Sequence, residues 1–301
     1  SYSRLRLFRD LRLGLLGHDV KNVQKTYEIM QTHFRYDLDY AVPFVPMTIN
    51  PFDPQWMQTL PLGLQIMMLS EVLELSVWTS EHDPEVIAYA RSLCIDGSVS
   101  TYLRIRFFSA LTRLMLLTLD LDEAEKALAN VENEVQAKKL QAWFEFLQGR
   151  SDKAMDLFEQ ALHLLRKNHR SKTAYFGDEC GLVFAFCLLK VQDRKAWDTM
   201  STIMEHAQRK HNVGTLFRSG YAALQAVLMY RQGQIHQAQK VLEEAQGTSL
   251  GTFAHLTVAL AKYWVGNEFR TQEREHLHNL LRTVQSQGMN WLVLEFGSLL
   301  Q

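Results

Sequence analysis

A chain of 301 residues is long enough for one elongated repeat array or for two ordinary domains. Its 47% hydrophobic and 22% charged residues are the balance of a globular protein and exclude an intrinsically disordered chain. The formal net charge of −1 excludes a general attraction to nucleic acid or to an anionic membrane, so that such a contact would need a local basic patch.

The first 98 residues are expected to form an N-terminal helical segment with a proline-rich connection. Residues 4–16 and 19–36 have the apolar spacing of amphipathic helices, and residues 41–56 are too rich in proline to be helical throughout. The apolar stretch at residues 60–78 is interrupted by glutamine and glutamate, which argues against a membrane span. All six prolines lie in this part of the chain: Pro43, Pro46, Pro51, Pro54, Pro61 and Pro84.

Residues 85–301 contain no proline, and this absence permits long uninterrupted helices. Pro84 itself follows an aspartate and precedes a glutamate, which predicts the start of a helix. Ser151 predicts another start, and Gly149, Gly233 and Gly266 predict helix ends. No strand-like alternation persists, so the fold class is predicted to be all-α.

The later helices repeat with a period of about 42 residues, a length typical of helical repeat arrays. Ala154, Ala196 and Ala238 are evenly spaced at this period, and a large apolar residue follows each of them one helical turn later. Small residues allow two helices to approach closely, and the larger residue one turn away fills the groove beside them. The period therefore predicts antiparallel helical hairpins that bury their apolar faces by stacking. A degenerate earlier hairpin is expected at residues 102–117 and 122–131.

Two stretches of the period are specific enough to compare with a known family. AWFEFLQGRSDKAMDLFEQA at residues 142–161 and AVLMYRQGQIHQAQKVLEEA at residues 226–245 resemble the small–glycine–small–large–small pattern of the tetratricopeptide repeat. The middle copy departs from this pattern, and the lengthened period means longer helices than are usual in that family. The resemblance implies a right-handed α-solenoid over residues 99–301. A HEAT-like array is the structural alternative.

Catalytic and cofactor motifs are missing from the sequence. It contains no phosphate-binding GxxxxGK[ST] or GxGxxG loop, no GxSxG elbow and no HExxH. His276 and His278 lie at alternate positions and point to different sides of a helix, which disfavours joint metal binding. The three cysteines, Cys94, Cys180 and Cys187, include no CxxC, which favours a reduced, cytoplasmic compartment. Cys180 and Cys187 are seven residues apart, on one helix face, and are expected to be buried free thiols. We therefore expect no enzyme, cofactor or metal.

Two surfaces are candidates for binding. Basic residues recur at the period of the alanines where successive helices end, and they predict a basic edge that could bind phosphate groups. In the alternative interpretation, these cations only stabilise the C-termini of their helices. Tyr221 and Tyr263 are candidate aromatics of the concave face. The residues of the candidate basic edge are Arg166, Lys167, Arg170, Lys172, Arg209 and Lys210.

Three functions remain open from the sequence. The leading hypothesis is a non-catalytic module for protein–protein interaction, which requires only the concave surface of the repeats. We expect the module to belong to a larger protein, because the chain starts at Ser1 and stops just after an apolar run. The opening helices and residues 181–198 also resemble the helical regions that precede bacterial Swi/Snf-type ATPases, for which nucleic acid would be a partner. The third hypothesis is the effector-sensing repeat domain of a transcriptional activator. A protein or peptide is the expected partner, and no membrane is.

Overall fold

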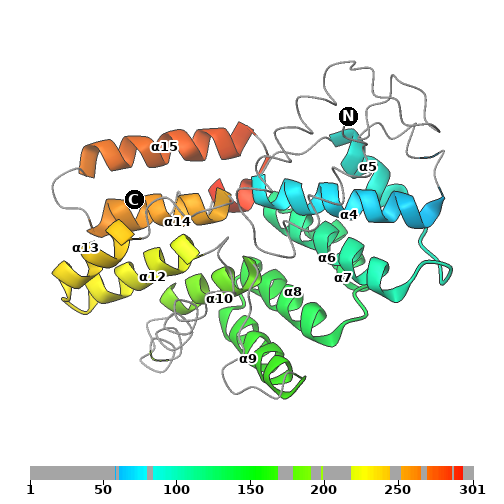
Figure 1. The fold of residues 1–301 in the computed structure, drawn as a ribbon, viewed down its shortest axis with the longest axis horizontal. Helices are drawn as coiled ribbons and strands as arrows, with labels where there is room; N and C mark the ends of the chain where they lie inside the picture. Colours follow the sequence, from blue (N-terminus) through cyan, green and yellow to red (C-terminus); the bar gives the residue numbers. More distant parts are fainter. Residues whose placement is uncertain are drawn as a thin grey trace, which may run out of the picture.

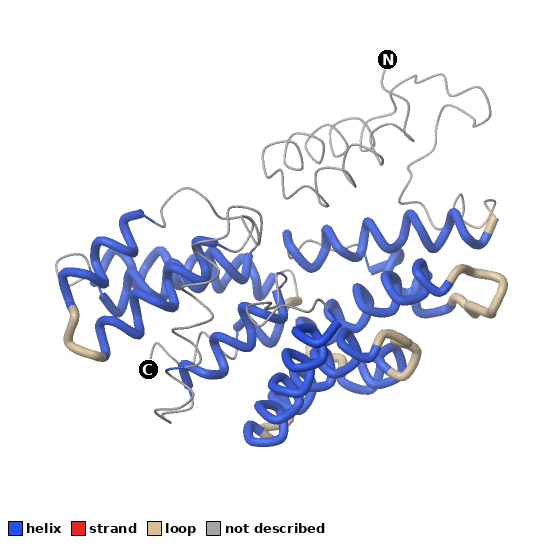
Figure 2. Tube along the Cα trace, turned by 60° about the horizontal axis from the view of Figure 1, so that its bottom comes forward, coloured by secondary structure: helices blue, strands red, loops and turns tan. Residues whose placement is uncertain are grey.

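The computed structural model describes residues 61–79, 84–168, 179–190, 218–244, 252–265, 270–286 and 288–293, together with residues 58 and 198. Within these ranges all long elements are helices, and no segment is a strand (Figure 2), which confirms the all-α class. The predicted helices at 4–16 and 19–36 and the connection at 41–56 lie outside them. The helices are α4 (Leu62–Thr79), α5 (Pro84–Ser92), α6 (Thr101–Thr118), α7 (Leu121–Leu128), α8 (Glu134–Leu147), α9 (Ser151–Asn168), α10 (Glu179–Lys190), α12 (Arg218–Arg231), α13 (Ile235–Glu244), α14 (Thr252–Val265) and α15 (Arg270–Ser286).

The helices form antiparallel hairpins that stack in chain order as a tetratricopeptide-like right-handed superhelix (Figure 1). Helices α4, α6, α8, α10, α12 and α14, called here the inner helices, pack each against the next. The outer helices α7, α9 and α13 each pack chiefly on their own inner helix and on the following one. Such stacking brings the inner helices closer together than the outer ones, so the inner helices line the concave side of the bend.

The hairpin turns carry the predicted glycines in the conformation that favours glycine. Gly149 has φ +76° and Gly233 has φ +80°, both left-handed. The amide of Gly149 donates to the carbonyl of Phe146 at 2.9 Å, and that of Gly233 donates to the carbonyl of Tyr230 at 3.0 Å. In both turns the next amide donates to the carbonyl one residue earlier in the helix, from Arg150 to Glu145 and from Gln234 to Met229, which completes a Schellman motif. The predicted helix ends at Gly149 and Gly233 are confirmed, and Gly266 lies outside the described residues.

The small and large positions of the period lie in the core where the structure describes them. Ala154 and Ala238 are 0% exposed, and the large residues one turn later, Phe158 and Leu242, are buried as well. Ala196 lies outside the described residues. The degenerate hairpin expected at residues 102–131 is present as α6 and α7, with Ala124 fully buried. The small residues thus allow the close approach of paired helices that the period predicts.

The first described hairpin, α4–α5, shares its core with the following hairpin. Helix α4 packs along α6, and two ion pairs join them: Glu71 with Arg106 at 2.8 Å, and Glu74 with Arg113. None of the described helices is long and apolar enough to cross a membrane, although α4 is the most apolar stretch of the first 98 residues. The division at residues 98 and 99 stays a prediction, and helices on both sides of it contribute to one continuous core.

The stack bends until its two described ends meet. Helix α14 packs against α4, the last inner helix against the first. Figure 1 shows the α14 ribbon, in orange, and the short red segment after α15 beside the left, C-terminal end of α4. This red segment comprises residues 288–293, and we call it the closing segment. The curvature of the superhelix therefore brings residues from opposite ends of the chain into one place.

Candidate functional site

The closing segment begins where α15 ends and passes to the inner side of the stack. Gly288 has φ +72°, and the amide of Met289 donates to the carbonyl of Val284 at 3.2 Å, so the chain reverses direction in a third Schellman turn. Within the segment Met289, Trp291 and Leu292 are at most 2% exposed. The side-chain amide of Asn290 donates to the carbonyl of Thr118 at the end of α6, at 3.2 Å. The segment is thus fixed against the first half of the array.

Trp291 lies in an aromatic cluster contributed by several inner helices. Its ring centroid is 5.1 Å from that of Trp143 on α8 at an interplanar angle of 62°, and 5.4 Å from that of Phe253 on α14 at 13°. Phe253 also meets Phe186 of α10 edge to face at 6.1 Å. One indole therefore bridges the middle and the end of the stack, in the offset and edge contacts that aromatic rings favour.

The two tryptophans of this cluster are buried without their usual polar partner. The indole nitrogens Nε1 of Trp143 and of Trp291 have no hydrogen-bond acceptor among the residues that the structure describes. A buried indole N–H commonly finds an acceptor, since leaving the group desolvated and unpaired costs about 1–3 kcal/mol. The cluster therefore has two buried donors whose hydrogen-bonding capacity is unused.

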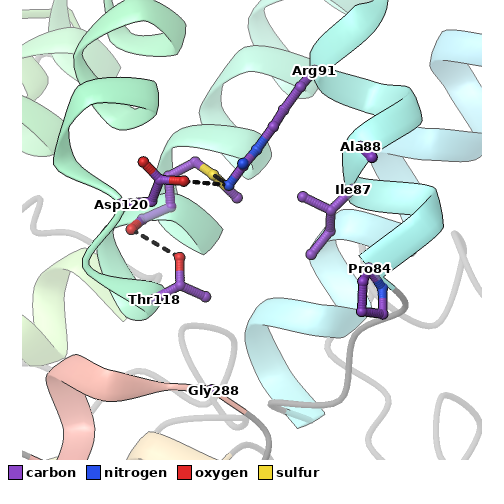
Figure 3. Close-up of a pocket in the computed structure, with 8 residues that line it drawn as sticks. Pro84, Ile87, Ala88, Arg91, Thr118, Asp120 and Gly288 are labelled. Carbon is purple, nitrogen blue, oxygen red and sulfur yellow. Dashed lines mark hydrogen bonds and ion pairs between the residues drawn. The ribbon is translucent and has the colours of Figure 1, made fainter.

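A pocket of about 310 Å³ opens beside the closing segment, between α5, the end of α6 and Gly288 (Figure 3). Arg91 reaches across it from α5, with Nη2 2.6 Å from Oδ2 of Asp120 and 2.7 Å from the sulfur of Met115. Thr118, whose carbonyl accepts the bond from Asn290, also lines the pocket. The pocket therefore lies on the seam where the two ends of the array meet.

A second, more accessible group of side chains lies where α12 and α14 end. Tyr230 and Arg231 end α12, and Tyr263 and Trp264 occupy the corresponding positions of α14. Only Arg231 among them is exposed, and the three rings are half-buried. The guanidinium carbon of Arg231 is 5.1 Å from the centroid of the Trp264 ring, a cation–π contact, and partial desolvation of the guanidinium lowers the pKa of this arginine. We call these four residues the aromatic patch.

The predicted concave-face tyrosines differ in their surroundings. Tyr263 belongs to the aromatic patch and is half-buried. Tyr221 is only 1% exposed, because α12 is covered by α10, α13 and α14, so its ring is part of the core. The placement of Tyr221 on an accessible concave surface is therefore wrong, and its side chain cannot contact a bound ligand in this arrangement.

The predicted basic edge is only partly within the described residues. Arg166 and Lys167 lie in the last turn of α9, where Lys167 is exposed and Arg166 is half-buried. Arg170, Lys172, Arg209 and Lys210 lie outside the described residues. The alignment of the two clusters along one edge therefore stays a prediction.

The cysteines and histidines show no metal-binding arrangement where they are described. Cys180 and Cys187 are buried on α10, as the sequence predicts, and Cys94 is free and exposed. His276 and His278 are both exposed on α15. The described residues contain no group of three or more histidine, cysteine or acidic side chains that could hold a metal ion.

Comparison with known proteins gives similarity at the level of the fold alone. No model of a protein family matches the sequence, and no curated protein matches it. The fold is similar to that of NprR, whose crystal structure was solved in complex with its cognate peptide NprX. The similarity has a TM-score of 0.50 at 13% sequence identity and covers 96% of this chain and 81% of the NprR chain. The similarity to a Swi/Snf-type accessory region gains no support from these comparisons.

Proposed function

We propose that this chain is a non-catalytic, peptide-binding helical-repeat module that recognises an extended segment of a protein or peptide partner. The observation that carries the proposal is the concave face of inner helices in a fold similar to that of NprR, a protein that was crystallised with its peptide. A concave helical surface suits an extended chain because successive inner helices can each contact one part of it. Of the three functions open from the sequence, this is closest to the effector-sensing domain, with a peptide as the effector.

The aromatic patch supports the proposal, since it combines the side-chain types that dominate binding energies at interfaces. Tyrosine, tryptophan and arginine are enriched among residues whose truncation weakens binding most. The Arg231 guanidinium over the Trp264 ring provides a cation with several N–H donors beside an apolar surface. Such a surface suits a peptide in which an acidic side chain or a backbone carbonyl group lies next to an apolar side chain.

The test is selection of random displayed peptides against the whole chain, followed by affinity measurements with variants. We expect the selected peptides to bind Arg231→Ala and Tyr263→Ala about tenfold more weakly than the parent chain, a loss of about 1.4 kcal/mol. The matched controls are His236→Ala and Lys240→Ala, exposed positions of the outer helix α13, which should leave the affinity unchanged. Failure to select any peptide, or equal losses in both pairs, would contradict the proposal.

A further inference from the structure

The seat of Trp291 has the form of a binding site for a flat aromatic side chain. Phe253 offers its face to the indole at an interplanar angle of 13°, and Trp143 meets it at 62°. These walls belong to α14 and α8, helices that are well separated along the stack, while the ring between them comes from residues 290–293, which are helical and follow α15. An aromatic side chain that took the place of Trp291 would meet the same walls.

The closing segment, in which residues 290–293 are helical, is held in this seat by its buried side chains and by a hydrogen bond. It follows the turn at Gly288. In addition to the contacts of its buried side chains, the side-chain amide of Asn290 donates a hydrogen bond to the carbonyl of Thr118, in the first half of the array. Its first residue also lines the seam pocket, so there is open space of about 310 Å³ at the place where the segment enters. The segment is therefore anchored by its buried side chains and by the Asn290 hydrogen bond, with an open pocket beside its first residue.

The unused hydrogen-bond donors show that the fit of the closing segment is incomplete. The seat contains the buried indole nitrogen of Trp143, from which no described residue accepts, and the segment brings a second one in Trp291. An extended peptide presents a backbone carbonyl at every residue, and one of these could accept from Trp143. A peptide in the seat could thus make a hydrogen bond that the closing segment does not make.

From these observations we infer that the slot between Trp143 and Phe253 is a recognition site for a tryptophan side chain of an incoming peptide, and that residues 288–293 occupy it in cis. The inference rests on the proposed function and makes it more specific, because it names the anchoring residue of the partner. It also makes the closing segment a built-in competitor. A partner must displace the segment, and the strength of that competition sets how tightly a peptide binds.

The experiment uses the whole chain and a fluorescently labelled peptide with the sequence of residues 286–295, together with the same peptide carrying alanine in place of its tryptophan. In the variant Trp291→Ala the slot has no occupant. We expect this variant to bind the tryptophan peptide at least about tenfold more tightly than the parent chain does, and to bind the alanine peptide no better than the parent. Phe108→Ala is the matched control, since it removes a half-buried aromatic side chain from the inner helix α6 without emptying the slot or touching the aromatic patch.

Two results would overturn the inference: a folded Trp291→Ala chain that binds neither peptide, and a parent chain that binds the tryptophan peptide as tightly as the variant. If the variant does not fold, hydrogen exchange of the parent chain decides. The amides of residues 289–293 should then exchange through an opening that leaves α8 protected, and exchange only together with α8 would refute the inference. Displayed peptides that bind at the aromatic patch with the same affinity in parent and Trp291→Ala would sustain the proposed function while removing this inference.

Discussion

The hairpins α8–α9 and α12–α13 have nearly the same backbone at their turns and different side chains around them. Their positions are two of the predicted periods apart in the sequence. Each turn has a glycine in the left-handed conformation, followed by a buried alanine at 0% exposure. Around the first turn, however, lies an ionic cluster, and the corresponding positions of the second turn are Met229, Gln234 and Gln237.

The ionic cluster of the first turn is built on a buried carboxylate. Glu145 has a side chain that is 4% exposed, and it pairs with Arg150 and, at 2.7 Å, with Lys153. The hydrogen bond from Arg150 lowers the pKa of Glu145 most, burial opposes this effect, and Lys153 adds to the lowering. The glycine and alanine positions therefore determine the hairpin geometry, because the second turn forms without any of these charges. The ion pairs contribute stability to one hairpin only.

The largest expected effect comes from overfilling the shared small position. Ala154→Trp and Ala238→Trp should each destabilise the fold by about 3 kcal/mol or more, because a side chain at 0% exposure has no room for an indole and the paired helices must separate. Chemical denaturation followed by circular dichroism measures the loss. If the alanine defines the hairpin in both places, the two losses should be similar despite the different charges nearby.

Exposed positions of the same outer helices provide the controls for this prediction. Glu159→Trp on α9 and Lys240→Trp on α13 place the same indole at exposed positions, and they should leave the midpoint almost unchanged. Alanine variants that unfold at the same denaturant concentration as these controls would show that the predicted period does not describe the packing.

Alanine in place of the two turn glycines should lower the stability by a smaller amount, which should again be equal in the two hairpins. Gly149→Ala and Gly233→Ala should each cost about 1 kcal/mol, because alanine is disfavoured at positive φ although a Cβ at either position meets nothing within 4 Å. Gly63→Ala is a control that should change the stability in the opposite direction. Gly63 lies in α4, a Cβ there meets nothing within 4 Å, and alanine should stabilise the helix by about 0.5–1 kcal/mol. A loss at Gly63 as large as at Gly149 would mean that the turn conformation is not the cause.

Much of the hairpin architecture could be predicted from the sequence because it depends on local chemistry. A glycine that ends a helix and an alanine that permits close approach act within one hairpin, so Gly149 and Ala154 are recognisable without knowledge of the stack. The absence of proline after residue 84 had the same local character. These features specify how each pair of helices forms.

The inner surface was harder to predict because it depends on the curvature of the whole stack. Trp291 and Trp143 are far apart in the sequence, and only the closure of the superhelix brings them together. Glu71 and Glu74 interrupt an apolar run in the sequence, and their arginine partners on α6 are evident only when the hairpins are stacked. Tyr221 failed as a surface residue for the same reason, since three neighbouring helices cover α12.

The smallest expected effect concerns the charge cluster itself and depends on pH. Because the folded chain lowers the pKa of Glu145 below its ordinary value of 4.5, ionisation of this carboxylate favours folding. This contribution is fully present above the ordinary value and is lost as the pH falls through the lowered value of the folded state. Glu145→Gln should therefore destabilise the chain by about 1 kcal/mol at neutral pH, since the cations that it leaves behind are half-exposed to water.

The difference between parent and Glu145→Gln, measured by denaturation over a series of pH values, should shrink as the solution becomes more acidic than pH 4.5. Met229→Gln is the matched variant at the corresponding position of the second hairpin, and its effect on stability should not change over the same series, because neither side chain titrates. A pH-independent difference for Glu145→Gln would mean that the carboxylate contributes through packing alone. The two hairpins would then differ in side-chain shape rather than in electrostatics.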